Sequence, residues 1–148
     1  MGKFDWQKKE VEAFPVYGLK DFVNREFRFV QTEDNRLFIS GGMGSFKDLR
    51  EVVEVEDKLI NLITHKDMRN GRRSHTLNVL GDKYLIATGG RDETGKYLNS
   101  CELYEIATME WFDLPPLIIA RQKHTGCVVS AQSLYVFCGI KETTLWGL

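Results

Sequence analysis

The chain has 148 residues, of which 43% are hydrophobic and 28% are charged, and its formal net charge is −1. This length suits one ordinary domain, and the balanced charge gives no electrostatic reason to bind nucleic acid or an anionic membrane. No apolar run could span a bilayer, and the three cysteines (Cys101, Cys127 and Cys138) lack the number and spacing of a disulfide framework or zinc site, which favours a reducing cytoplasm.

Short strands are predicted along the whole chain. The first lie within residues 4–15, which align without gaps on residues 104–115, and the apolar run LFISGG follows at 37–42. Residues 49–63 fit either a helix of 3.6-residue period or two strands, and their β-branched residues favour two strands. Further strands are expected at 74–80, 83–90, 98–106 and 110–114, with two more within 124–140.

The sequence repeats itself at a nearly constant step. Gly41 and Gly89 are 48 residues apart, and Gly89 and Gly139 are 50 residues apart. A step of 49 residues relates four further pairs: Arg72 with Arg121, His75 with His124, Val55 with Tyr104, and Leu62 with Trp111. A period of about 40–50 residues is typical of propeller blades and helical arrays. Four strands per period, without strong helix signals, favour a β-propeller.

The middle repeat resembles the kelch motif. Paired glycines follow an apolar strand, a tyrosine follows a variable loop, and a tryptophan comes seven residues later, at Gly89, Gly90, Tyr104 and Trp111. The resemblance implies an all-β fold of kelch-type propeller blades, each with four antiparallel strands. We expect the glycines to permit close approach of a neighbouring blade and the aromatic side chains to pack between blades.

The other two repeats depart from this motif. The first keeps Gly41 and Gly42, but the alignment puts Val55 and Leu62 at its aromatic positions. The third keeps Gly139, has Ile140 at the second glycine, and ends before any tyrosine or tryptophan of the motif.

The predicted blades do not form a closed ring by themselves. Residues 3–15 supply the last strands of one blade, residues 23–63 and 74–114 supply two full blades, and residues 124–140 supply the first two strands of another. The single domain of residues 1–148 thus holds about three blade equivalents, whereas propellers usually have about four to eight. Two explanations stay open: the chain is part of a longer propeller, or two copies close a six-bladed homodimer with two-fold symmetry.

No catalytic, metal or cofactor site is predicted. The G-x-G at 42–44 has Lys47 where a nucleotide-binding loop needs a third glycine. His75 and His124 are repeat equivalents, which favours a shared structural role over catalysis or metal binding. A nucleophile elbow of the form G-x-S-x-G is absent from the sequence.

The connecting loops carry the candidate binding residues. The resemblance implies that two sets of loops gather on one face, where arginines in family members hold acidic peptides. Guanidinium groups suit carboxylates, but each cation could instead be a solvated loop charge, and two of the arginines could pair with acids inside the fold. The candidates are Arg72, Arg73, Arg91, Lys96, Arg121 and Lys123.

These observations favour a non-catalytic, scaffold-like module that binds a protein or peptide. Acidic peptides are among the candidate partners. Two alternatives stay open. One is an enzyme domain of the kelch-like oxidase or sugar-processing type, which would need a metal constellation or convergent acids. The other is a purely architectural subunit of a larger assembly.

Overall fold

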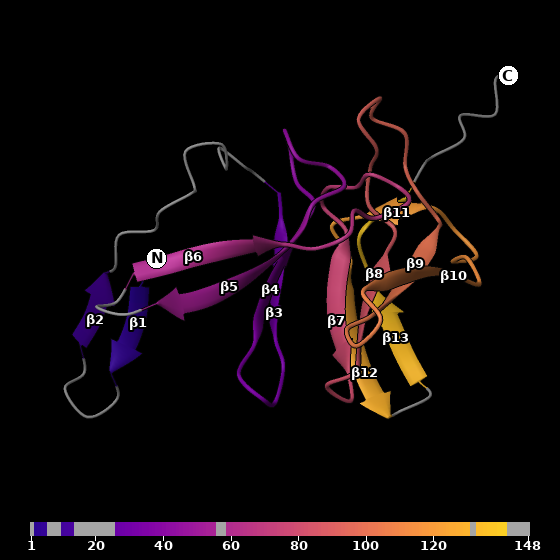
Figure 1. Ribbon diagram of the computed structural model, residues 1–148. Helices are drawn as coiled ribbons and strands as arrows, with labels where there is room; N and C mark the ends of the chain where they lie inside the picture. The colour runs from indigo at the N-terminus through magenta and orange to yellow at the C-terminus, as the bar shows by residue number, and fades with distance from the viewer. Residues whose placement is uncertain (1, 6–9, 14–25, 56–58, 131–132, 142–148) are drawn as a thin grey trace, which may run out of the picture.

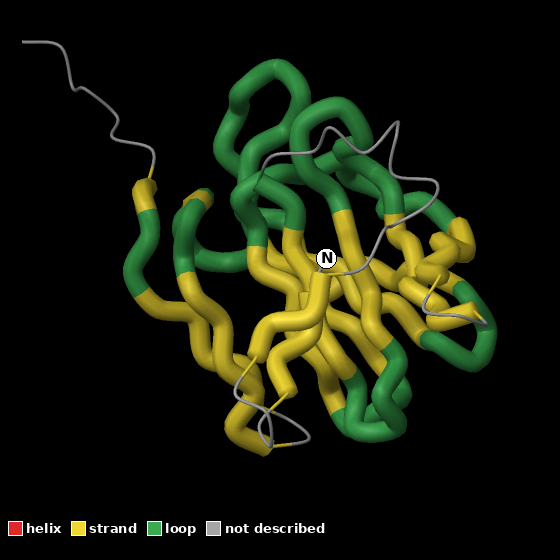
Figure 2. The backbone as a smooth tube through the Cα atoms, turned by 90° about the vertical axis from the view of Figure 1, so that its left-hand side faces the viewer, coloured by secondary structure: helices red, strands yellow, loops and turns green. Residues whose placement is uncertain are grey.

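The computed structural model describes the backbone of residues 2–5, 10–13, 26–55, 59–130 and 133–141, and the side chains of residues 26–53, 61–130 and 133–141. Residues 14–15 and 23–25, at the ends of two predicted blades, lie outside these ranges. Every regular element described is a β-strand (Figures 1 and 2). The described residues include no helix that is long and apolar enough to cross a membrane. The predicted all-β class is confirmed.

Two four-stranded antiparallel sheets form the middle of the molecule. In each sheet, strands that follow one another in the sequence pair with one another. The first sheet consists of β3 (Arg28–Gln31), β4 (Leu37–Ser40), β5 (Leu49–Val55) and β6 (Leu59–Thr64). The second consists of β7 (Thr76–Leu80), β8 (Tyr84–Thr88), β9 (Cys101–Glu105) and β10 (Glu110–Leu114). These sheets are two blades of the predicted kind.

Two hairpins lie at opposite ends of the molecule (Figure 1). β1 (Gly2–Asp5) pairs with β2 (Glu10–Ala13), and β12 (Thr125–Ser130) pairs with β13 (Ser133–Phe137). A short pair, β11 (Arg121–Gln122) with β14 (Ile140–Lys141), joins the turns on either side of the second hairpin. The described residues therefore form two complete blades and two half-blades.

The blades pack face to face, with their first strands side by side. β7 contacts both β3 and β12. Tyr104 and Trp111 are at most 2% exposed, their ring centroids are 5.0 Å apart, and the Trp111 indole donates to the Lys66 carbonyl oxygen at 2.8 Å. Phe38 and Leu49 of the first blade belong to the same cluster. Burying each side chain of this size contributes roughly 1.5–3 kcal/mol, so the interface between blades is the hydrophobic core.

A row of backbone hydrogen bonds ties each blade to the next. The Ser74 N–H donates to the Glu26 carbonyl at 3.0 Å, and the Lys123 N–H donates to the Ser74 carbonyl at 2.8 Å. These three residues each stand two positions before the first strand of a blade. Their φ angles are 68°, 50° and 53°, although none is a glycine. Because left-handed backbone costs about 1–3 kcal/mol at such residues, these bonds hold the chain in a conformation it would otherwise avoid.

The first glycine of each pair is required by the neighbouring blade. Gly41 and Gly89 both have a φ of 56°, and an added Cβ would lie no more than 2.7 Å from the carbonyl oxygen of Arg72 or Arg121. The second glycine of each pair donates its N–H to that same carbonyl, at 3.0 and 2.8 Å. A side chain at the first position would separate the blades and break this bond.

The third repeat is shifted by one residue from the sequence alignment. The register of β12–β13 matches that of β7–β8 when Phe137 is aligned with Thr88. Cys138 and Gly139 then stand at the two glycine positions, and Cys138 has a φ of 57°. The assignment of Ile140 to the second glycine position was therefore wrong, because Ile140 belongs to β14.

The tyrosine position of the first repeat is also corrected. Val52 pairs with both Leu37 and Leu62, and Tyr104 has the corresponding partners in the second blade. Val52, and not Val55, is thus the equivalent of Tyr104. The alignment failed because two length changes nearly cancel. The β4–β5 connection is four residues shorter than the β8–β9 connection. The segment between the paired residues Val52 and Leu62 is three residues longer than the segment between Tyr104 and Trp111.

The substitution Cys138→Gly should stabilise the protein. Glycine adopts positive φ without a steric penalty, so we expect the free energy of unfolding to rise by about 1 kcal/mol, measured by urea denaturation. Cys138→Ala is the matched control because it removes the thiol but keeps the Cβ. Equal stability of the two variants would contradict the assignment of Cys138 to a glycine position.

Candidate functional site

The candidate binding residues lie in loops at one end of the blades. Because consecutive strands run in opposite directions, the connections after β4, β6, β8 and β10 all emerge at the same end of the blades, as Figure 2 shows. We call residues 43–48, 66–73, 91–98 and 115–123 the loop face. All six cations predicted from the sequence lie in these segments, but their environments differ.

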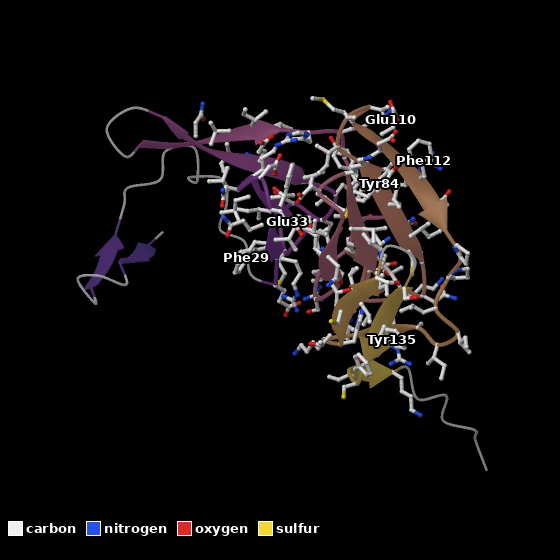
Figure 3. The ribbon with its side chains drawn as sticks, turned by 90° about the horizontal axis from the view of Figure 1, so that it is seen from below. Phe29, Glu33, Tyr84, Glu110, Phe112 and Tyr135 are labelled. Atoms are coloured by element: carbon white, nitrogen blue, oxygen red, sulfur yellow. The ribbon has the colours of Figure 1, made fainter. Side chains whose placement is uncertain are left out.

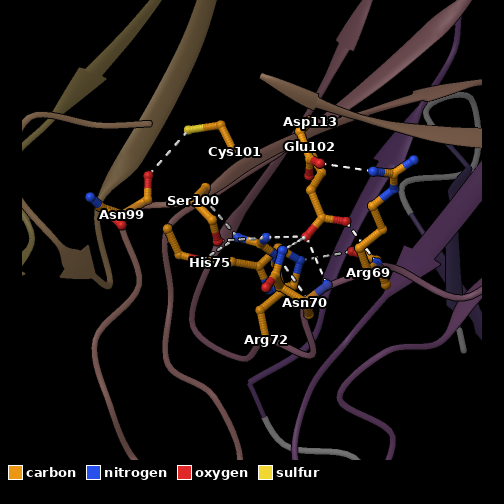
Figure 4. A network of polar contacts seen from close by, with 11 residues as sticks. Arg69, Asn70, Arg72, His75, Asn99, Ser100, Cys101, Glu102 and Asp113 are labelled. Carbon is orange, nitrogen blue, oxygen red and sulfur yellow. Dashed lines mark hydrogen bonds and ion pairs between the residues drawn. The ribbon is translucent and has the colours of Figure 1, made fainter. Parts of the chain in front are cut away.

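Arg72 is completely buried beneath the loop face. Its guanidinium donates to the Gly89 carbonyl at 2.7 Å and to the Ser100 carbonyl at 3.0 Å (Figure 4). It also forms an ion pair with Glu102, and both side chains are 0% exposed. Arg72 therefore pairs with an acid inside the fold, as one of the two sequence interpretations proposed, and its side chain is not presented to a partner.

The carboxylate of Glu102 is surrounded by donors from the turn before β7. It accepts the backbone N–H of Arg69 at 2.8 Å and that of Asn70 at 2.9 Å, and also the Asn70 side-chain amide at 2.8 Å. We call these two backbone N–H groups and the Arg72 guanidinium the carboxylate nest. The nest compensates the desolvation of a buried charge pair, which is costly unless every group is hydrogen-bonded.

Arg121 occupies the same position in the third repeat. It donates to the Cys138 carbonyl at 2.9 Å, as Arg72 does to the first glycine of its own blade. In the described part of the chain, no carboxylate contacts Arg121 or the backbone N–H groups of Ile118 and Ile119, which are the counterparts of the other nest donors. Among the described residues, the third repeat therefore has the counterparts of the nest donors without a carboxylate bound to them.

Arg73 and Arg91 are held next to each other by their backbones. Each donates its N–H to the other's carbonyl oxygen at 2.9 Å. The Arg73 side chain reaches Glu26 at 3.3 Å. The Arg91 guanidinium donates to the Gly95 carbonyl at 2.7 Å and lies 5.2 Å from the centroid of the Tyr97 ring. These two contacts fix the position of the guanidinium. No carboxylate among the described residues pairs with Arg91 to neutralise its charge.

The two predicted lysines are exposed. Lys96 ends a tight loop in which the Asp92 carboxylate accepts the N–H groups of Thr94 and Lys96, both at 2.9 Å. The Thr94 hydroxyl also donates to this carboxylate, and these bonds lower its pKa. Lys123 lies at the start of β12, where its charge helps to lower the pKa of the Glu26 carboxyl, after the larger effect of the Ser74 hydroxyl. Both lysines are accessible to a partner.

Sequence reasoning missed the acidic part of the loop face. A hollow of about 270 Å³ opens between the two complete blades, lined by Phe46, Lys47, Asp48, Gly71, Asp92 and Glu93 among others. Asp92 and Glu93 therefore stand in the same loop as the predicted cations Arg91 and Lys96, and Asp48 stands in the loop before β5. The signal was present in the loop sequences FKD and RDE, in which acidic residues stand next to basic ones.

The histidines serve the joints between blades. The Nε2 atom of His75 lies 2.8 Å from the Ser40 hydroxyl, and that of His124 lies 2.9 Å from the Thr88 hydroxyl. Burial, together with neighbouring arginines, lowers the pKa of His75 well below 6.5 and that of His124 to about 4. Both rings are therefore neutral at neutral pH, and each joins one blade to the next.

His65 belongs to a relay of polar groups across the same interface. Its Nδ1 atom lies 2.7 Å from the Tyr104 hydroxyl, and its Nε2 atom lies 3.0 Å from Glu51, which also pairs with Arg36. Burial raises the pKa of Tyr104 to about 12, and the Arg36 hydrogen bond lowers that of Glu51. Tyr104 and His65 are buried, so this relay satisfies polar groups inside the joint. Among the described residues, no three His, Cys, Asp or Glu side chains are grouped as metal ligands.

Comparison with known proteins supports the propeller fold but does not assign the chain to a family. No family model matches the chain. Kelch-like protein 7 of Homo sapiens is 39% identical over 59 residues, which are 40% of this chain and 10% of that protein. The solved structure of YjhT superposes with a TM-score of 0.66 at 17% identity and covers 80% of this chain and 35% of that one. The chain thus spans about a tenth of the first protein and about a third of the second. The blades and these similarities support a kelch-type propeller fold.

Removing the acid of the buried ion pair should strongly destabilise the protein. Glu102→Gln leaves the Arg72 charge buried without a counter-charge, so we expect the free energy of unfolding to fall by roughly 3–5 kcal/mol. Asp113→Asn is the control, because the Asp113–Arg69 pair is exposed and should contribute at most about 1 kcal/mol. Similar losses for the two variants in urea denaturation would contradict the structural role of Glu102.

Acidification should destabilise the fold between about pH 6.5 and pH 4. The folded pKa of His124 lies below its unfolded value, so the unfolded chain binds the proton first and the stability present above pH 6.5 is lost as the pH falls. Urea denaturation at several pH values would measure this slope. His124→Gln should make the slope shallower, with His75 accounting for the remainder. An unchanged slope in this variant would refute the assignment.

Proposed function

We propose that this chain is a non-catalytic protein-interaction module whose loop face binds a protein or peptide carrying acidic side chains. The observation that carries the proposal is the state of Arg91. Its guanidinium is fixed by the Gly95 carbonyl and the Tyr97 ring, and it has no carboxylate partner in the described part of the chain. A fixed guanidinium loses little conformational freedom when it binds a carboxylate.

The loop face contains two kinds of cation. One kind is neutralised by a neighbouring acid, and its members are Lys66 with Glu110, Arg69 with Asp113, Arg72 with Glu102, and Arg73 with Glu26. For the other kind, the described residues provide no ion-pair partner, and its members are Lys47, Arg91, Lys96, Arg121 and Lys123. The second kind is available to an acidic partner, and the acidic hollow beside Lys47 supplies a repulsive element that would select among partners.

The similarity to Kelch-like protein 7 and the propeller fold support this class of function without identifying a partner. Fold alone does not define activity. We also propose a cytoplasmic location, because Cys101, Cys127 and Cys138 are free thiols and a reducing compartment preserves such thiols.

Binding of a synthetic decapeptide of alternating glutamate and glycine would test the proposal. We expect the purified chain to bind this peptide more tightly than the matched glutamine–glycine peptide, with an affinity that falls as salt is added. Arg91→Gln should weaken binding about tenfold, since a charge-assisted hydrogen bond is worth roughly 1.5–3 kcal/mol.

Arg69→Gln is the matched control, because Arg69 already has a carboxylate partner. Equal binding of the two peptides, or equal losses in the Arg91 and Arg69 variants, would refute the proposed site.

A further inference from the structure

Two surfaces have the character of blade interfaces, but no described blade covers them. On the half-blade, Tyr135 and Phe137 are 52% and 51% exposed, and their rings stack with centroids 6.1 Å apart. On the first blade, Phe29 is 66% exposed. Figure 3 shows Phe29 and Tyr135 on different sides of the molecule. Side chains of this size are normally buried between blades, as Tyr104 and Trp111 are.

An apolar groove also lies between the second blade and β13. Its volume is about 460 Å³, and its lining includes Leu80, Ile86, Leu103, Leu114, Leu134 and Val136. By the register of the sheets, Leu134 and Val136 correspond to Leu85 and Ala87 of the second blade. In that blade, Tyr104 and Trp111 of the two outer strands pack against Leu85 and Ala87. The groove therefore lies at the position that the two outer strands occupy in a complete blade.

The β1–β2 hairpin has the pairing of those missing strands. It pairs Phe4 with Val11, as β9–β10 pairs Tyr104 with Trp111, and both hairpins have the same number of residues between these partners. Because alternate residues of a strand share a face, Phe4 and Val11 belong to one face and the charged Lys3 to the other. The hairpin and β13 lie at opposite ends of the molecule (Figure 1), so a β1–β2 hairpin that filled this groove would come from another copy of the chain.

The residues around the groove fit this hairpin rather than a copy of β9–β10. Between the complete blades, the Tyr104 hydroxyl is satisfied by His65, which is in turn bonded to Glu51. The hairpin has Phe4 at the position of Tyr104, so it has no hydroxyl that needs a partner. The counterparts of the two partner residues, His65 and Glu51, are apolar as well. At the corresponding positions, the second blade has the leucines Leu114 and Leu103.

The exposed faces show a second matched change. At each described joint, a hydroxyl at the end of one blade's second strand bonds a histidine just before the first strand of the next blade, as Thr88 bonds His124. On the half-blade, Phe137 stands at the hydroxyl position. On the first blade, Phe27 stands at the histidine position, one residue before β3. The hydroxyl of the described joints is thus Phe137 on one face, and the histidine is Phe27 on the other. These two aromatic residues would contact each other if the faces met.

We propose that two copies of this chain join into a six-bladed ring, in which the β1–β2 hairpin of each copy completes the half-blade of the other. The hairpin pairs antiparallel to β13, with Phe4 opposite Leu134 and Gly2 opposite Val136. The Glu26 N–H of each copy then donates to the Lys123 carbonyl of the other, which continues the row of backbone bonds between blades. Such an interface is isologous and closes on itself. It does not depend on the function proposed for the loop face.

This register makes a specific prediction about the empty carboxylate nest. Gly2 takes the position of Glu102, so the hairpin brings no carboxylate to Arg121. The substitution Gly2→Glu should supply one. If the hairpin docks in the proposed register, the dimer dissociation constant should fall at least about tenfold, and Arg121→Gln should abolish this gain.

Light scattering on a sizing column, over a dilution series, would test the dimer. We expect a mass near twice 17.1 kDa that falls to one chain on dilution. Leu134→Glu should shift the protein to monomer, whereas Met109→Glu, which places the same charge on an exposed turn, should not. Circular dichroism would confirm that both variants remain folded.

Three results would overturn the proposal. They are a monomer at every concentration, a dimer that Leu134→Glu leaves intact, and a Gly2→Glu gain that survives in the Arg121→Gln background. The last comparison keeps the test decisive if Leu134→Glu prevents folding.

Discussion

The structure depends on the hydrogen bonds that join one blade to the next. At each described joint, a backbone N–H before one first strand donates to the equivalent carbonyl of the preceding blade, a glycine N–H donates to an arginine carbonyl, and a hydroxyl contacts a buried histidine. These bonds require left-handed backbone at Glu26, Ser74 and Lys123, and a residue without a side chain at Gly41 and Gly89. The repeated residues of the sequence are thus mainly residues of the joints, and the apolar side chains between blades supply most of the stability.

The joints also decide which loop residues can act at the surface. Because Arg72 binds the carbonyl of Gly89 and the carboxylate of Glu102, its charge is used inside the fold. Arg91 is joined to the same turn only through its backbone, so its side chain remains on the loop face. The division of the cations into structural and accessible members therefore follows from the geometry of the joint, and it is the basis of the binding function proposed for this face.

The sequence was sufficient for the class of fold and for the pairs of equivalent residues that keep a constant step, such as His75 and His124. It was insufficient where two length changes compensate, and so Val55 was aligned with Tyr104 although Val52 is its equivalent. It also failed at Cys138, because the alignment matched glycine to glycine and a cysteine at positive φ has no sequence signature. The polar loop sequence around Arg72 did not decide whether its side chain is buried. The one available signal was Glu102, a lone acid between the apolar residues Cys101 and Leu103 of a strand.

The most direct test of the closed ring is amide hydrogen exchange at Glu26, followed by NMR at high and low protein concentration. The Ser74 and Lys123 amides are bonded within one chain and should be protected at both concentrations. If two copies close the ring, the Glu26 amide should be protected at high concentration and should exchange rapidly once the protein is diluted to monomer. Rapid exchange of the Glu26 amide at every concentration, while the other two amides stay protected, would contradict the ring.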